Sequence, residues 1–181
     1  MAFRLRKTVV LVGMMGAGKT AVGTALARLL GVAFRDSDAE IVQAANMTIA
    51  EIFERDGEAF FRQRESEILQ RLLEDTPAIL STGGGAFLSG RNREIIASRG
   101  VSLWLRADLE LLWARVRHKD TRPLLRTADP HETLRRLCLE REPEYAKAEI
   151  TVRARPEFSI EDMAQEVTKA LLERPDVLKR V

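Results

Sequence analysis

The chain has 181 residues, of which 45% are hydrophobic and 31% charged, a composition typical of one ordinary globular domain and not of a disordered or fibrous protein. Its 29 Lys and Arg nearly balance its 27 Asp and Glu, so the formal net charge is only +2, and nucleic acid is not an expected partner. No apolar run approaches the roughly 20 residues of a membrane-spanning helix, and the short leader cannot hold a signal-peptide apolar region, so we expect a cytoplasmic protein with no membrane partner.

Short apolar runs recur along the chain and predict five β-strands. The first, Thr8–Val12, is continuous and rich in β-branched residues, as expected for a strand buried on both faces of a parallel sheet. Similar runs follow at residues 33–36, 78–82, 101–105 and 149–153, and segments of helical period separate them. This alternation predicts one α/β domain over residues 1–181.

The expected helices carry start and stop signals. Lys19–Leu30 ends at Gly31, a residue suited to a left-handed C′ position. Asp129 is followed by proline and predicts the N-cap of a later helix, and Pro143 predicts that this helix ends near Arg141.

Two stretches fit the alternation poorly. Residues 37–70 contain more helix than a crossover between two strands requires and are dense in Arg and Glu, so we interpret them as a substrate-binding insert. Residues 117–128 are basic, lack amphipathic spacing and join two expected helices. We interpret them as a mobile lid.

Residues 13–20, which we call the phosphate loop, form the strongest motif. They match G-x-x-x-x-G-K-[ST] between a strand and a helix, which is the context that this motif requires. Small residues let backbone N–H groups wrap around phosphate oxygens, and the helix that follows adds its positive end. The lysine supplies charge to the β- and γ-phosphates and the threonine hydroxyl can coordinate Mg²⁺. The sequence therefore predicts an ATP site made of Gly13, Met14, Met15, Gly16, Ala17, Gly18, Lys19 and Thr20.

Asp36 and Asp38 follow the second predicted strand, at the edge where open α/β sheets bind ligands. Residues two positions apart share one side of an extended segment. One carboxylate could then face a metal ion while the other orients an acceptor hydroxyl or takes its proton. An acidic turn with a helix N-cap is the alternative interpretation.

Further short motifs follow along the chain: Phe61-Arg62, Ser81-Thr82-Gly83-Gly84-Gly85-Ala86, Arg122-Pro123-Leu124-Leu125, and Arg141 with Pro143 and Tyr145. Together with the phosphate loop and Asp36-Ser37-Asp38, these motifs resemble the shikimate kinase family, small P-loop kinases of the nucleoside-monophosphate-kinase type. The resemblance covers nearly the whole chain. It implies a three-layer P-loop kinase fold, with a five-stranded parallel sheet flanked by helices. It also implies ATP and Mg²⁺ as cofactors, a monomer, and transfer of the γ-phosphoryl group to the 3-hydroxyl of shikimate in the chorismate pathway.

The resemblance also implies roles on the acceptor side of the site. Asp38 would bind the hydroxyls of shikimate, and Arg62 and Arg141 would hold its carboxylate. Gly83, Gly84 and Gly85, which we call the glycine turn, would bring backbone close to the substrate. These residue types suit a carboxylated polyol, which needs planar cations for the acid and acceptors for the hydroxyls.

On the nucleotide side the resemblance implies a metal pair, Thr20 and Asp36, and adenine contacts. Arg115 would lie against the base, with Arg155 and Pro156 in the adenine loop. Ser81 stands where related enzymes place a metal-side acidic residue. Lys19 and Arg122 would stabilise the transferring phosphate, and with Asp38 they make up the expected catalytic set.

Three other functions compete with this interpretation. A small-molecule kinase acting on gluconate would share the fold and the phosphate loop. A regulatory module would bind ATP without transferring phosphate, and a nucleic-acid-dependent ATPase would need a basic track that this chain does not offer. His118, His131 and Cys138 have no expected role.

Overall fold

Five strands form the central sheet of the computed structural model, which describes residues 2–118 and 125–181. Every pairing in this sheet is parallel, and the strand order is β3-β4-β2-β5-β6. The predicted five-stranded parallel sheet is therefore confirmed. The strands are β2 (Thr8–Val12), β3 (Phe34–Asp36), β4 (Ile79–Ser81), β5 (Gly100–Arg106) and β6 (Ile150–Arg153).

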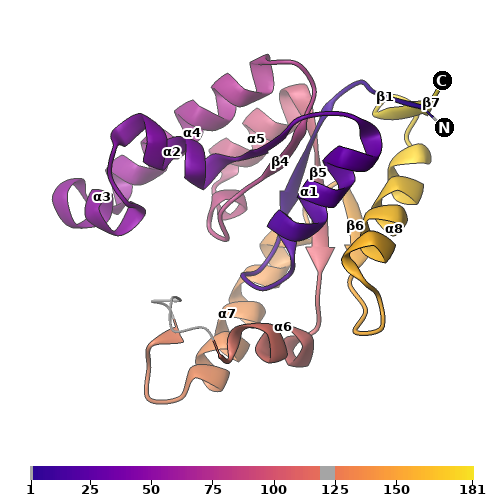
Figure 1. Ribbon diagram of the computed structural model, residues 1–181. Helices are drawn as coiled ribbons and strands as arrows, with labels where there is room; N and C mark the ends of the chain where they lie inside the picture. The colour runs from indigo at the N-terminus through magenta and orange to yellow at the C-terminus, as the bar shows by residue number, and fades with distance from the viewer. Residues whose placement is uncertain (1, 119–124) are drawn as a thin grey trace.

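Helices cover both faces of this sheet, which explains why its central strands are apolar throughout. Every residue of β2 is buried. On one face α1 (Lys19–Leu30) packs against α8 (Ile160–Leu172), and on the other α4 (Glu58–Glu74) packs against α5 (Gly90–Arg99) (Figure 1). As predicted, α1 ends at Gly31, which is left-handed with φ 70°.

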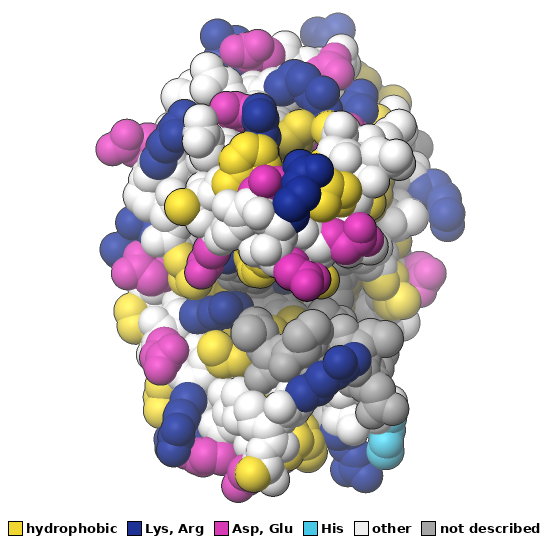
Figure 2. Space-filling view, turned by 90° about the vertical axis from the view of Figure 1, so that its left-hand side faces the viewer, with side chains coloured by type: hydrophobic (Ala, Val, Ile, Leu, Met, Phe, Trp, Pro, Cys, Tyr) yellow, Lys and Arg dark blue, Asp and Glu magenta, His cyan; other side chains and the backbone are white. Residues whose placement is uncertain are grey.

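The stretch predicted as an insert is helical. It contains α2 (Ser37–Ala45), α3 (Ile49–Asp56) and most of α4, and Figure 1 shows α2 and α3 standing away from the sheet at one side. Figure 2 looks onto this side and shows cationic and anionic side chains interspersed over it. The surface in that view carries no broad field of one sign, in agreement with the near-neutral composition.

The prediction for the end of α7 (Pro130–Tyr145) is wrong. Pro143 lies inside this helix, and the backbone N–H of Ala146 still bonds to Glu142 at 2.9 Å. Pro143 is exposed, so its ring meets solvent, whereas Tyr145 in the same turn is fully buried. Proline has no backbone N–H, so the helix loses one hydrogen bond at Pro143. The packing of Tyr145 stabilises the last turn and offsets this loss.

A second, two-stranded sheet has no counterpart in the sequence prediction. β1 (Phe3–Leu5) pairs antiparallel with β7 (Leu178–Arg180), so the two ends of the chain lie side by side (Figure 1). Strands of three residues carry too few positions for a periodic pattern to identify them. Over the described part of the chain, no helix is long and apolar enough to cross a membrane.

Candidate active site

The phosphate loop joins β2 to α1 at the carboxyl edge of the sheet. Gly16 and Gly18 have φ of 82° and 94°, a left-handed conformation that glycine adopts readily and larger residues avoid. Gly18 is the N-cap of α1, and no described side chain caps this helix start. The first backbone N–H groups of α1 therefore remain available to an anion, as a phosphate site requires.

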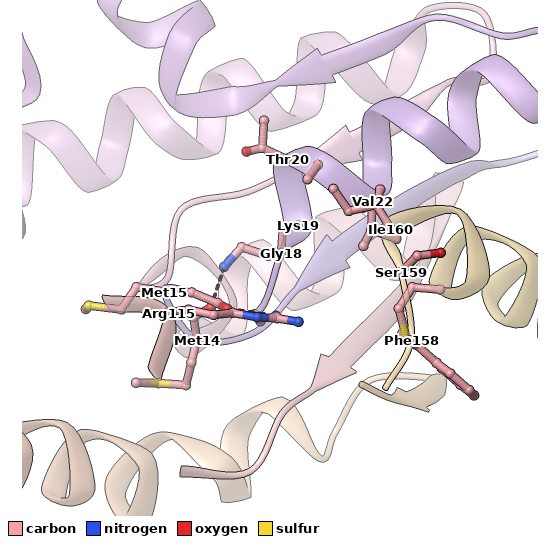
Figure 3. Close-up of a pocket in the computed structure, with 14 residues that line it drawn as sticks. Met14, Met15, Gly18, Lys19, Thr20, Val22, Arg115, Phe158, Ser159 and Ile160 are labelled. Atoms are coloured by element: carbon pink, nitrogen blue, oxygen red, sulfur yellow. Dashed lines mark hydrogen bonds between the residues drawn. The ribbon is translucent and has the colours of Figure 1, made fainter. Parts of the chain in front are cut away.

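Lys19 folds back over this loop. Its Nζ donates to the backbone carbonyl oxygens of Gly13 at 2.5 Å and Met14 at 3.2 Å, and the bond to Met14 is drawn dashed in Figure 3. The ammonium group is thus held at the loop that would cradle the phosphates. The predicted contact between Lys19 and the β- and γ-phosphates stays a prediction.

A cavity of about 440 Å³ opens beside the phosphate loop. Arg115, from α6 (Leu109–Val116), lines it and donates from Nη1 to the carbonyl of Gly16 at 3.0 Å (Figure 3). Partial burial lowers the pKa of Arg115 from its ordinary value. The structure therefore brings Arg115 to the same cavity as the phosphate loop.

The opposite wall comes from the start of α8 and the residues before it: Phe158, Ser159, Ile160 and Met163. Arg155 and Pro156, the predicted adenine residues, are exposed and are not among the residues lining this cavity. Arg155 instead lies over the Phe158 ring at 5.6 Å. Sequence reasoning missed this apolar wall, for which an aromatic residue two positions after Pro156 is a weak signal.

The acidic pair is arranged differently from the sequence prediction. Asp36 ends β3, but α2 begins at Ser37, so Asp36 and Asp38 do not share one side of an extended segment. Oδ1 of Asp36 accepts from the backbone N–H groups of Asp38 at 2.9 Å and Ala39 at 3.3 Å. Asp36 is therefore the N-cap of α2, the alternative named above.

The carboxyl of Asp38 lies close to Gly83. Burial raises the pKa of its carboxyl above the ordinary value, and the neighbouring charge of Asp36 adds to this rise. Lys19 and Arg62 act in the opposite direction, so both cations lie near this carboxyl. Oδ1 of Asp38 is buried and has no hydrogen-bond partner within the described residues. A buried acceptor left open in this way is a place for a ligand hydroxyl.

The glycine turn is the point at which the acceptor side comes together. A Cβ atom built on Gly83 would lie 2.7 Å from Oδ2 of Asp38. A Cβ on Gly85 would lie 2.5 Å from Nη2 of Arg62. A Cβ on Gly84 would lie 3.0 Å from Nη1 of Arg141. Asp38, Arg62 and Arg141, which we call the acceptor cluster, thus each face one glycine, and the absence of side chains there lets them converge.

Two more side chains support this cluster, and sequence reasoning gave them no role. Tyr145 lies one helical turn after Arg141 on α7, and its hydroxyl donates to the carbonyl of Gly84 at 2.5 Å. Glu65 is buried on α4 and accepts from Nη1 of Arg62 at 3.0 Å. Burial raises the pKa of the Glu65 carboxyl, while Arg62 opposes the rise. A buried tyrosine or glutamate cannot be told from a surface one by sequence spacing alone.

Some predicted residues stand apart from this geometry. Arg122 and residues 119–124, half of the predicted lid at 117–128, lie outside the described residues. Ser81 is buried at the end of β4. Burial raises the pKa of the Cys138 thiol to about 11, so it is not a nucleophile near neutral pH.

Comparisons with known proteins point to one family. The family model described as shikimate kinase matches residues 15–172. Shikimate kinases from Ruegeria pomeroyi and Cereibacter sphaeroides are 65% and 62% identical, over 98% and 97% of this chain and 91% and 88% of theirs. A structure of shikimate kinase from Acinetobacter baumannii in complex with shikimate superposes with a TM-score of 0.85 at 40% identity, covering 92% of this chain and 93% of that one. A gluconokinase from Sinorhizobium meliloti, at 17% identity and a TM-score of 0.63, shares the fold.

Proposed function

This chain belongs to the shikimate kinase family, and from that membership we propose that it transfers the γ-phosphoryl group of ATP to the 3-hydroxyl of shikimate. The products are shikimate 3-phosphate and ADP. The observation that carries the proposal is the acceptor cluster, which converges on the glycine turn with Lys19 of the phosphate loop near Asp38.

The chemistry of the acceptor cluster matches a carboxylated polyol. Arg62 and Arg141 present two planar guanidinium groups, which recognise a carboxylate through paired N–H donors. Asp38 presents an acceptor for hydroxyls, and its buried Oδ1 is open for one. A substrate with an acid at one end and hydroxyls at the other fits this division, whereas ATP hydrolysis alone requires no such cluster.

Phosphoryl transfer depends on alignment and on positive charge around the phosphate oxygens. Lys19 supplies such charge from the phosphate loop. Asp38 holds the acceptor hydroxyl and takes its proton, a role that its raised pKa favours because the carboxylate becomes a better base. The resemblance adds Arg122 to this set, and its contribution to the transition state stays a prediction.

Thr20 and Asp36 are the residues that would hold Mg²⁺. Hydroxyl and carboxylate oxygens are ligands that Mg²⁺ accepts, and the cap bonds of Asp36 use only Oδ1. Among the described residues, no group of three or more His, Cys, Asp and Glu could hold a metal ion. When bound, the ion supplies further positive charge to those phosphates.

The remaining expectations stay predictions. They are adenine contacts from Arg155 and Pro156 beside Arg115, a substrate-binding role for residues 37–70, a lid at 117–128, a monomeric state and a cytoplasmic location.

An ADP-release assay tests the proposed function. It is run with ATP and Mg²⁺ and with no acceptor, with shikimate or with gluconate, and we expect release only with shikimate. ADP release without an acceptor would favour an ATPase, and ADP release with gluconate would favour a gluconate kinase. No ADP release under any of the three conditions would favour a module that binds the nucleotide without transferring phosphate.

A pair of arginine variants on one helix locates the acceptor. Arg141→Ala should raise the KM for shikimate about tenfold or more, because a hydrogen-bonded charge is lost. Arg136→Ala is the control, since Arg136 lies on the same helix but is exposed and pairs with Glu132. Equal KM values for the two variants would exclude Arg141 from the acceptor site.

A further inference from the structure

Asn92 lies fully buried in the first turn of α5, and its side chain joins three parts of the chain. Its Nδ2 donates to Oε1 of Glu65 at 3.2 Å and to the carbonyl of Ala86 at 2.9 Å. Its Oδ1 accepts from the hydroxyl of Ser66 at 2.6 Å. A carboxylate and a carbonyl can only accept, so these partners fix which way the amide faces.

Glu65 connects Asn92 to Arg62. Both carboxylate oxygens of Glu65 accept from Nη1 of Arg62, at 3.0 and 3.2 Å. The Glu65 side chain is 1% exposed, whereas that of Arg62 is 34% exposed. Water therefore has little access to Glu65, and its orientation depends on its protein partners. Asn92 is the neutral donor among these partners, and it donates to Oε1, which also accepts from Arg62.

The same amide also reaches the glycine turn. Ala86 directly follows Gly85, and the N–H of Ala86 bonds to the carbonyl of Gly83 at 3.1 Å. The bond from Asn92 to the Ala86 carbonyl thus anchors the end of this turn. On the other side of the turn, a Cβ on Gly85 would meet the guanidinium of Arg62. One side chain therefore contacts both elements whose spacing sets the position of Arg62.

We propose that Asn92 is a positioning residue for recognition of the acceptor carboxylate: it holds Glu65, and through Glu65 the guanidinium of Arg62, at a fixed distance from the glycine turn. The inference rests on the proposed function and deepens it, because it names a group that never touches the substrate yet sets its affinity. An amide suits this position because it offers two hydrogens and one acceptor. Aspartate would place a second carboxylate against Glu65, and leucine would offer no polar group.

The first test is Asn92→Leu, measured in the ADP-release assay. We expect the KM for shikimate to rise about tenfold or more while the KM for ATP changes less than about twofold, since a bond to a buried charge is lost on one side of the site. The matched control is Ser66→Ala. It removes the hydroxyl that donates to Asn92 but leaves the bonds from Asn92 to Glu65 and Ala86. It should raise the KM for shikimate less than about threefold.

A double-mutant cycle with Arg62→Ala separates positioning from general loosening. If Asn92 acts through Arg62, Asn92→Leu should raise the KM for shikimate by less than about twofold once Arg62 is absent. An equal effect in both backgrounds, or equal rises in KM for ATP and shikimate, would overturn the inference. If Asn92→Leu does not fold, Asn92→Asp keeps the shape of the side chain and is expected to raise the same KM.

Measurements on the wild-type chain distinguish a failure of the proposed function from a failure of this inference. No shikimate-dependent ADP release by the wild type would defeat the proposed function and this inference with it. Wild-type activity combined with an unchanged KM for shikimate in the folded Asn92 variants would defeat this inference alone.

Discussion

The nucleotide side and the acceptor side of the site are built in opposite ways. The phosphate loop is eight consecutive residues whose backbone groups and helix start form the binding surface. The acceptor cluster is three side chains from α2, α4 and α7, more than 100 residues apart at the extremes, that meet at the glycine turn. One side is made by local chain geometry and the other by packing.

This difference predicts how each side responds to substitution. A loop made of backbone fails when its few special residues change, because nothing else can supply the same dihedrals or charge. An assembled cluster can be disturbed from a distance, since each guanidinium or carboxylate depends on the side chains behind it. Glu65, Asn92 and Tyr145 are such supports, and none of them needs to touch a ligand.

The largest expected effect is on the nucleotide side. Lys19→Ala removes the loop ammonium group, and we expect kcat in the ADP-release assay to fall about a thousandfold or more. Thermal unfolding should be nearly unchanged, since Lys19 is only partly buried and donates to carbonyls of its own loop. Lys169→Ala is the control, because this exposed lysine pairs with Glu166 on α8. Turnover near the wild-type rate in Lys19→Ala would remove the phosphate-loop assignment.

A smaller effect is expected from the turn on the acceptor side. Gly85 has φ −90° and ψ −11°, which alanine adopts freely, so Gly85→Ala adds only a methyl group directed at Arg62. The end of an arginine side chain can move aside, so the fold should survive while Arg62 is displaced. We expect the KM for shikimate to rise about tenfold and the KM for ATP to stay within about twofold, as for loss of one charged hydrogen bond.

Gly90→Ala is the matched control for this methyl group. A Cβ on Gly90 would meet Nη2 of Arg93 at 3.4 Å, an ordinary contact, and the residue starts α5 away from the cluster. It should leave both KM values unchanged. If Gly85→Ala behaves like Gly90→Ala, the close approach between the turn and Arg62 has no role in acceptor binding.

The contrast between the two sides also explains what the sequence could predict. The parallel sheet follows from buried β-branched runs, and that prediction is confirmed. The phosphate loop follows from a contiguous motif, which lies between β2 and the start of α1, and its nucleotide role stays a prediction. The acceptor cluster came from the resemblance, because an isolated Arg62 or Arg141 looks like any solvated helix residue. The supports behind it, such as Asn92, depend on which helices pack together, and no local pattern encodes that.

The errors have the same origin. Pro143 predicts a helix end because proline removes a backbone donor, but the burial of Tyr145 stabilises the turn beyond it. Strand period predicts that Asp36 and Asp38 share one side of an extended segment, but the strand ends at Asp36, which caps α2. In both cases a tertiary contact or a cap outweighed the local preference.

The smallest expected effect comes from Tyr145, the single tyrosine of the chain. Tyr145→Phe keeps the ring, which lies 6.0 Å from that of Trp104, and removes the hydroxyl that donates to Gly84. Loss of one buried hydrogen bond should lower the free energy of unfolding by about 1 kcal/mol, and the melting temperature by about 2–4 °C. The KM for shikimate should rise about twofold, because the turn loses one of its anchors.

The hydroxyl of Thr24 gives the comparison on the nucleotide side. It donates to the carbonyl of Thr20 at 2.7 Å on the exposed surface of α1, and Thr24→Val removes it while keeping the shape of the side chain. The KM for ATP should not respond to this change, since the loop keeps its own backbone geometry. A larger rise in the KM for ATP in Thr24→Val than in the KM for shikimate in Tyr145→Phe would contradict the division between the two sides, because it would mean that side-chain support matters more for the loop than for the assembled cluster.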